Sequence, residues 1–199
     1  IKAEGPLQAK DFKDARKNKT GWWDWKPAKK ALEQLFMEGE LMVVKRQSFQ
    51  KVYDLTERVL PVHVDTSIPS EEEYFQHLII SYLKANAIGT PQQMTYLLKG
   101  HKASIRAHCM QMIEEGLLIT VTVDKKSYFA LPAINDLLKK KLNHNKVKIL
   151  SPFDNLLIQR KRTKEIFNYD YQIECYVPAD KRKIGYFNLP ILWGRTFAG

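Results

Sequence analysis

The residues with the clearest chemical capacity in this sequence are clusters of lysine and arginine. The densest cluster lies at 160–164, and its basic members are Arg160, Lys161, Arg162 and Lys164. A second cluster consists of Lys26, Lys29 and Lys30, which are spaced so that they share one face of a helix. Grouped cations of this kind bind phosphates, because they displace counterions from a polyanion. A solvated helix face has the same composition, so both interpretations stay open.

Two smaller basic sets accompany segments that resemble a hairpin and a helix. The hairpin set surrounds a tip at 47–49 and consists of Lys45, Arg46 and Lys51, and the helix set consists of His101, Lys102 and Arg106. We expect both sets to contact the phosphates of a polyanionic partner. Phe49, at the hairpin tip, is expected either to be exposed there or to pack beneath the sheet.

Three tryptophans precede the lysines of the second cluster, at Trp22, Trp23 and Trp25. An indole in this place stacks on a base or wedges between base steps. Alternatively, the three rings fasten the following helix to its domain, since tryptophan buries a large apolar area. The sequence leaves both roles open.

Composition excludes several classes of protein. The chain has 199 residues, a formal net charge of +10 and 44% hydrophobic residues, which is too apolar for a disordered basic tail. No apolar run is long enough to span a bilayer, so no membrane association is expected. The two cysteines form no disulfide framework, and His101, His108 and Cys109 lack ligand spacing, so we expect no metal and no cofactor. The first residue is Ile1, which suggests a fragment of a longer protein.

The elements that must position these residues occur as a repeat. Helices are expected at 27–38 and 104–115, each ending at a glycine, Gly39 or Gly116, and each followed by a hairpin at 41–55 or 118–131. Upstream of these helices, short helical stretches are expected at 5–12 and 89–98. The second copy adds a first helix at 71–87, with an apolar face formed by Tyr74, Leu78, Tyr82 and Leu83. Three helices followed by a two-stranded hairpin form a winged helix, and the first helix of the first copy is expected to lie upstream of these residues.

The remaining third of the chain differs from the repeat. A basic helix is expected at 133–142, a strand at 147–150, a helix within 155–167, and strands at 171–177 and 184–192, joined by a basic connection at 178–183. The fold class is therefore α+β: tandem winged-helix (helix-turn-helix) domains at 1–62 and 63–131, then a mixed α/β segment with antiparallel strands at 132–199. Basic residues outnumber acidic ones 13 to 9 in 1–62 and 13 to 6 in 132–199, so charge is concentrated in these two parts.

Three blocks carry a resemblance to a known family. They are Gly21-Trp22-Trp23-Asp24-Trp25-Lys26-Pro27, Gly39-Glu40-Leu41-Met42-Val43 and Ser151-Pro152-Phe153-Asp154-Asn155-Leu156-Leu157. Together they resemble the C-terminal half of the YcaQ-type, or AlkZ-like, winged-helix DNA glycosylases of bacteria. The resemblance implies a repair enzyme that hydrolyses the N-glycosidic bond of N7-alkylated purines, including crosslinked guanines. It implies double-stranded DNA as partner, a monomer and a cytoplasmic, nucleoid-associated location.

The resemblance also implies a catalytic Gln-x-Gln or Gln-x-Asp triplet in the family's N-terminal half, and no such triplet occurs in these residues. The nearest match is Gln172-Ile173-Glu174, which we interpret as part of an alternating strand whose two polar side chains share one face. Asp154 is expected to cap a helix N-terminus, with an active-site role as the alternative. The chain alone is therefore expected to bind DNA without catalysing, and a winged-helix transcription regulator without enzymatic activity is the alternative function.

Overall fold

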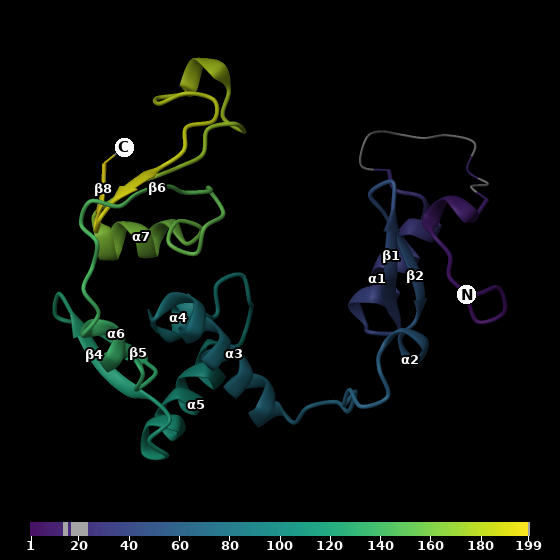
Figure 1. Ribbon diagram of the computed structural model, residues 1–199, viewed down its shortest axis with the longest axis horizontal. Coiled ribbons are helices and arrows are strands. Elements are labelled where there is room, and N and C mark those ends of the chain that lie inside the picture. Colours follow the sequence, from purple (N-terminus) through teal and green to yellow (C-terminus); the bar gives the residue numbers. More distant parts are fainter. Residues whose placement is uncertain (14–15, 17–23, 199) are drawn as a thin grey trace. The chain divides into compact units, whose positions relative to one another are not determined.

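The computed structural model describes residues 1–13, 16 and 24–198, and it divides into two compact units. The first unit is 1–68 and the second is 69–199. Each has a hydrophobic core of its own. Figure 1 labels the helices and strands of both units. The boundary expected near residue 62 thus lies at 68/69. The further division of the second unit at 131/132 stays a prediction.

The first unit is a helix packed on a two-stranded antiparallel hairpin. Helix α1 is Pro27–Met37, the strands are β1 at Leu41–Gln47 and β2 at Gln50–Leu55, and two short helical turns are η1 at Ala9–Asp11 and α2 at Thr56–Val59. Pro27 stands in the first turn of α1, where its missing N–H costs no hydrogen bond. The core is formed by Leu32, Leu41 and Tyr53.

The expected helical stretch at 5–12 is wrong apart from the single turn η1. Leu7 instead exchanges two backbone hydrogen bonds with Tyr53, at 2.9 and 2.8 Å, and so extends the edge of β2. Because this pairing fixes an extended backbone before η1, no longer helix can form there.

The second unit begins with three helices and a hairpin. They are α3 at Glu71–Asn86, α4 at Pro91–Met94, α5 at Lys102–Glu114, β4 at Ile119–Val123 and β5 at Lys126–Ala130, with β3 at Ile88–Gly89 as a third strand beside β5. Ser70 starts α3 with a capping box to Glu73. The helix buries Phe75, Ile79 and Leu83. Of the expected face, Leu83 is buried and Leu78 and Tyr82 pack against this core, whereas Tyr74 lies outward at 39% exposure.

The rest of the second unit contains a small antiparallel sheet and one amphipathic helix. Its elements are α6 at Ile134–Leu138, β6 at Val147–Ile149, α7 at Arg160–Phe167, η2 at Ala179–Lys181, β7 at Ile191–Trp193 and β8 at Thr196–Phe197, with strand order β6-β7-β8. A third core, formed by Leu150, Leu157 and Tyr171, joins the sheet to the segment before α7.

Several expectations for this last part are wrong. Residues 171–177 form no strand, the strand expected at 184–192 is reduced to β7, and the helix expected at 133–142 is reduced to α6. The reason for the first is the Glu174 side chain, which accepts backbone N–H groups of Lys183 and Gly185 and so replaces a strand ladder with a side-chain anchor. The architecture of the two units is α+β with antiparallel sheets. None of the helices in the described ranges is long and apolar enough to cross a membrane.

Candidate nucleic-acid interface

The lysines of α1 lie at the start of the helix. Lys26 is the N-cap residue, half-buried, and Lys30 is exposed one turn later. The Lys29 ammonium lies 4.0 Å above the centre of the Trp25 ring, which is a cation–π contact. Trp25 thus positions a lysine of the cluster while remaining 39% exposed. Trp22 and Trp23 fall outside the described residues, so their two possible roles stay predictions.

The three basic residues of the first hairpin differ in their surroundings. Lys51 on β2 forms an ion pair with Glu33 of α1 at 2.7 Å, and its ammonium also lies 4.7 Å from the centre of the Phe36 ring. The hydrogen bond from Lys51 lowers the pKa of the Glu33 carboxyl, and the same bond raises the pKa of Lys51. Lys51 therefore fastens the hairpin to α1, and its charge is already compensated.

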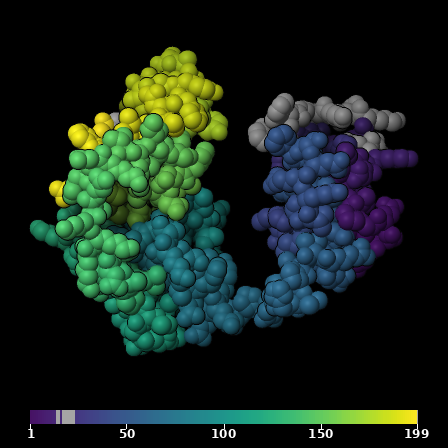
Figure 2. All heavy atoms as spheres, in the orientation of Figure 1, coloured from purple at the N-terminus to yellow at the C-terminus, as the bar shows by residue number. Residues whose placement is uncertain are grey.

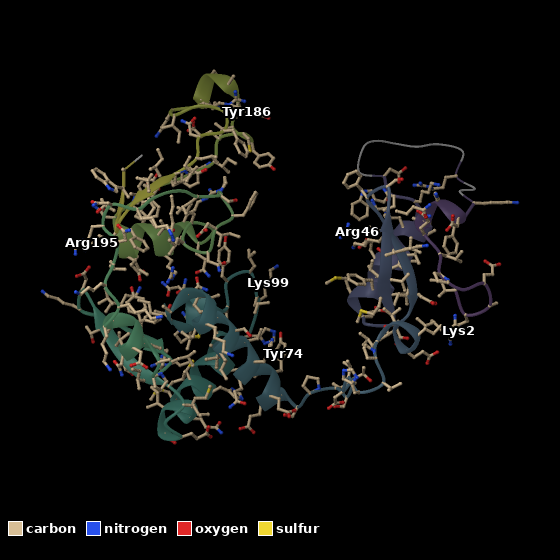
Figure 3. The ribbon with its side chains drawn as sticks, viewed as in Figure 1. Lys2, Arg46, Tyr74, Lys99, Tyr186 and Arg195 are labelled. Atoms are coloured by element: carbon tan, nitrogen blue, oxygen red, sulfur yellow. The ribbon has the colours of Figure 1, made fainter. Side chains whose placement is uncertain are left out.

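Arg46 lies opposite Lys51 in the hairpin register, and both it and Lys45 are exposed (Figure 3). The turn that follows consists of Ser48 and Phe49, which both have positive φ, the backbone of a tight two-residue hairpin turn. Phe49 is 93% exposed at the tip, so it does not pack beneath the sheet. Two cations and an exposed ring consequently stand together at this end of the hairpin.

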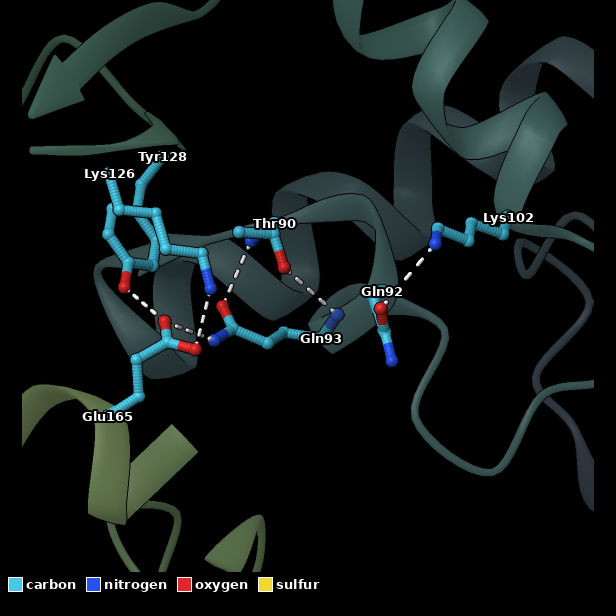
Figure 4. A network of polar contacts seen from close by, with 7 residues as sticks. All are labelled: Thr90, Gln92, Gln93, Lys102, Lys126, Tyr128 and Glu165. Atoms are coloured by element: carbon cyan, nitrogen blue, oxygen red, sulfur yellow. Dashed lines mark hydrogen bonds and ion pairs between the residues drawn. The ribbon is translucent and has the colours of Figure 1, made fainter. Parts of the chain in front are cut away.

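The basic set on α5 is only partly available. His101 precedes the helix with its ring against Tyr74 and Phe75, at centroid distances of 6.5 and 5.6 Å. Lys102 is exposed and donates to Gln92 Oε1 at 3.4 Å, as drawn in Figure 4. Arg106 is exposed on the same helix. Packing thus occupies His101 and leaves Lys102 and Arg106 at the surface.

The histidine and cysteine of α5 belong to the core. His108 packs on Phe75 and contacts the Ser104 carbonyl oxygen at 2.8 Å. Burial raises the pKa of the Cys109 thiol to about 12, so the thiolate is not formed near neutrality. Within the described ranges, no group of three or more His, Cys, Asp or Glu side chains could hold a metal ion.

The basic cluster at 160–164 lies in helix α7, which exposes three of its members and buries the fourth. Arg160 and Lys161 are exposed, and Lys164 is exposed in an ion pair with Asp170 at 2.7 Å. Arg162 is only 4% exposed. Its Nη2 donates to the Asn86 carbonyl oxygen at 2.8 Å, while Nε and Nη1 are buried without a hydrogen-bond partner. Leaving such donors unpaired costs about 1–3 kcal/mol each.

Glu165, on the next turn of α7, joins this helix to the second hairpin (Figure 4). Its carboxylate accepts hydrogen bonds from the Tyr128 hydroxyl, from Lys126 at 2.6 Å and from Gln93 at 3.4 Å. Burial acts to raise the pKa of Glu165, but the bonds from Lys126 and Tyr128 outweigh it and the pKa is lowered. Burial and the bond to Glu165 raise the pKa of Tyr128 to about 12. The junction therefore holds a charged carboxylate and a neutral phenol.

Asp154 and the Gln172-Ile173-Glu174 triplet hold backbone rather than exposing reactive groups. Asp154 Oδ1 accepts the Leu156 N–H at 2.9 Å in a turn that precedes α7 by several residues. Glu174 is 8% exposed and accepts N–H groups of 183–185, which lowers its pKa, whereas Gln172 is exposed. The expectation that Gln172 and Glu174 share one face is therefore wrong.

One exposed surface was not singled out from the sequence. Around η2, the second unit presents large exposed side chains next to basic ones: Tyr176, Tyr186, Phe187, Lys181 and Lys183. We call these residues the η2 lobe, which stands out from the rest of its unit in Figure 2 (yellow). Arg182 supports it by donating to the Val177 carbonyl at 2.8 Å and by lying 4.9 Å from the centre of the Tyr186 ring, labelled in Figure 3. The available signal is the basic run at 181–183, flanked by aromatic residues at 176, 186 and 187.

Comparison with known proteins gives one family. The family model described as DNA glycosylase AlkZ-like matches residues 1–199. The chain belongs to this family. Membership in the AlkZ-like family indicates a DNA repair glycosylase and implies DNA as its partner. No solved structure matches the chain.

In this AlkZ-like chain, the structure brings some of the expected DNA-binding residues together and separates others. Lys30 is exposed on α1, and Lys45 and Arg46 are exposed together near the tip of the first hairpin. Two other expected residues are not free at the surface: Lys51 is held in an ion pair with Glu33, and Arg162 is buried. Burial depends on which elements pack together, so residue type alone could not separate the two groups.

Proposed function

We propose that this AlkZ-like chain binds duplex DNA through tandem winged helices, as the DNA-holding part of a glycosylase that releases N7-alkylated purines. The element order supports the winged-helix interpretation. Helix α1 leads into β1–β2, and α3, α4 and α5 lead into β4–β5. In a winged helix the helix before the hairpin and the hairpin itself lie against the duplex, and α1 and β1–β2 carry the exposed cations of the first unit.

The observation that carries the proposal is the difference between Arg46 and Lys51, which face each other across the hairpin. Lys51 is neutralised by Glu33, but Arg46 is exposed beside Lys45. Two adjacent uncompensated cations at a hairpin tip suit phosphate oxygens. Phosphate binding is independent of sequence, so the binding is expected to be largely nonspecific and sensitive to salt.

We further propose that the chain by itself does not cleave the glycosidic bond. The family resemblance assigns catalysis to a Gln-x-Gln or Gln-x-Asp triplet, which these residues lack. We propose in addition that the protein is bacterial, cytoplasmic and monomeric and uses no cofactor. We also propose that the glycosylase unhooks interstrand crosslinks. The alternative, a transcription regulator, predicts a strong preference for one DNA sequence.

The experiment is a titration of the chain with several unrelated duplexes at increasing salt. The slope of log K against log salt should be similar for all duplexes. In the variant carrying Lys29→Ala, Lys30→Ala and Arg46→Ala, that slope should become shallower by about 0.9 for each phosphate that is no longer neutralised. Lys139→Ala is the matched control, since this exposed lysine of the second unit pairs with Asp136. Strong sequence preference, or an unchanged slope in the triple variant, contradicts the proposal.

A further inference from the structure

The second unit contains a cavity of about 740 Å³ between α4, the second hairpin and the segment that leads into α7. Its lining includes Thr90 and Tyr96, next to α4, and Phe153 and Gln159, from the segment before α7. All lining residues belong to 69–199, so the cavity is complete within one compact unit. Its size is in the range of about 300–1,000 Å³ that is usual for sites of small organic groups.

The lining is positively charged. Arg160, Lys161, Arg162 and Lys126 all contribute to it. Among the lining residues, all of which the structure describes, Glu165 is the one carboxylate, and Lys126 pairs with it at 2.6 Å. Three cations therefore remain for a ligand, which must carry negative charge.

Arg162 contributes a buried polar side chain to the wall of the cavity. Its side chain is more than nine-tenths buried, and two of its three guanidinium nitrogens have no hydrogen-bond partner. The third nitrogen donates to the Asn86 and Ile88 carbonyl oxygens, which accept N–H groups without carrying a full opposing charge. A cation fixed beneath a cavity wall is poorly screened by water, so its field favours an anion above it.

The remaining features of the cavity suit a planar group. Phe153 is 67% exposed and Tyr96 is 44% exposed, and the Tyr96 hydroxyl donates to the Ile158 carbonyl at 3.3 Å, which fixes that ring. Gln92 accepts from Lys102 through Oε1, so its amide N–H groups remain for acceptors on a ligand edge. Aromatic rings, an amide donor and surplus positive charge together match a base attached to a phosphate.

We propose that this cavity binds a single unpaired nucleotide of a DNA strand, with the base against Phe153 and Tyr96 and the phosphate between Arg160 and Lys161. This inference rests on the proposed function, because it takes DNA as the partner. It assigns to the second unit a preference for unpaired nucleotides, in addition to the phosphate binding of the first unit. Free nucleotides share the same chemistry, and the test separates the two sources.

The test compares the binding of three probes to the 199-residue chain. They are a fully paired duplex, the same duplex with one bulged 2-aminopurine nucleotide, and the free 2-aminopurine deoxynucleoside monophosphate. Affinity is measured by fluorescence anisotropy, and stacking by quenching of the 2-aminopurine emission. We expect the bulged duplex to bind about tenfold more tightly than the paired one, as one stacked base provides. Quenching should accompany its binding.

Two variants locate the preference. Phe153→Ala should reduce the ratio of bulged to paired affinity to about one, while leaving the paired affinity unchanged. Tyr176→Ala is the matched control, because this ring is 86% exposed and outside the cavity, and it should keep the full ratio. Arg160→Ala with Lys161→Ala should weaken the bulged complex more than the paired one.

The outcomes distinguish this inference from the proposed function. If the paired duplex binds in a salt-dependent manner but the bulge gives no advantage, the cavity inference alone is overturned. A ratio retained in Phe153→Ala overturns it as well. If the free monophosphate is quenched and the bulged nucleotide is not, the cavity takes free nucleotides and the DNA assignment is wrong. If no duplex binds, the proposed function itself fails.

Discussion

Gly39 and Gly116 end their helices with the same hydrogen bonds and the same left-handed backbone. Gly39 has a φ of +83°, and the N–H of Glu40 reaches back to the Leu35 carbonyl at 2.9 Å. Gly116 has a φ of +73°, and the N–H of Leu117 reaches the Met112 carbonyl at 2.8 Å. Both are Schellman ends, and each turns a helix directly into a hairpin.

The first prediction concerns these two glycines. Gly39→Ala and Gly116→Ala should each destabilise the protein by about 1–2 kcal/mol, because a Cβ is unfavourable at this φ although no atom lies within 4 Å of it. Chemical denaturation followed by tryptophan and tyrosine fluorescence measures the loss. Gly39→Asn and Gly116→Asn are the controls, since asparagine tolerates the left-handed region. An alanine variant as stable as the parent would contradict the argument.

The parts of the fold that the sequence predicts correctly are those set by short-range signals. The ends of α1 and α5 and both hairpins are confirmed, because glycine, alternation and turn residues act over a few positions. The strand expected at 171–177 is wrong because Glu174 bonds to backbone nine to eleven residues away. No local pattern distinguishes a strand from a loop that is tied in this manner.

The candidate site has the same limitation. The run at 160–164 was correctly identified as basic, but its division into an exposed part and a buried part depends on contact between α7 and the end of α3. Arg162 reaches the carbonyl of Asn86, 76 residues earlier. A buried arginine in a polar run has the same sequence signature as an exposed one, so only the tertiary structure separates them.

The second prediction concerns the η2 lobe. Glu174→Gln should release the backbone of 183–185 and increase the rate of tryptic cleavage after Lys181, Arg182 or Lys183 by about tenfold. Cleavage is followed by mass spectrometry at pH 8, where the carboxylate is ionised. Asp180→Asn, which replaces an exposed acid of η2 itself, should leave the rate unchanged.

The anchor also has a predicted pH dependence. The hydrogen bonds from Ile184, Lys183 and Gly185 lower the pKa of Glu174 in the folded protein. Its contribution is therefore complete above the unfolded pKa of about 4.3 and is lost as the pH falls through the folded pKa. In Glu174→Gln this acid dependence should be absent. Acid titrations of both proteins, monitored by fluorescence, would differ if the assignment is correct.

The third prediction concerns the two cysteines. Burial raises the pKa of Cys109 to about 12, whereas Cys175 is only half-buried. One thiol per native chain should therefore react with a disulfide reagent at pH 8, and two should react in denaturant. Cys175→Ser should abolish the fast reaction, and Cys109→Ser should preserve it. Fast reaction of both native thiols would show that the core around α5 opens readily.

The fourth prediction concerns the junction of α7 with the second hairpin. Tyr128→Phe and Glu165→Gln each remove one partner of the same bond, so their effects on the free energy of unfolding should not be additive. We expect a coupling energy of about 0.5–3 kcal/mol in a double-mutant cycle. Lys139→Ala combined with Glu165→Gln is the additive control, since Lys139 pairs with Asp136. Additive effects of Tyr128→Phe and Glu165→Gln would mean that the bond does not stabilise the junction.

The last prediction is that the 199-residue chain does not release N7-methylguanine from methylated duplex DNA. Glycosidic hydrolysis needs a group that positions a water at the sugar carbon, and loss of one preorganised polar group commonly costs about 10²–10³ in rate. The nearest candidates here are unsuited to that task. Glu174 uses its carboxylate to hold backbone N–H groups, and Gln172 is exposed to solvent on a loop.

Base release is measured by chromatography after incubation with methylated duplex, beside a reaction without protein. The two rates should be equal, and a salt titration of duplex binding with the same preparation serves as the control that the chain is folded. Gln172→Ala and Glu174→Gln provide the decisive comparison. Release by the parent chain that either substitution abolishes would place catalysis at residues 172–174, and the assignment of this chain to DNA holding alone would be wrong.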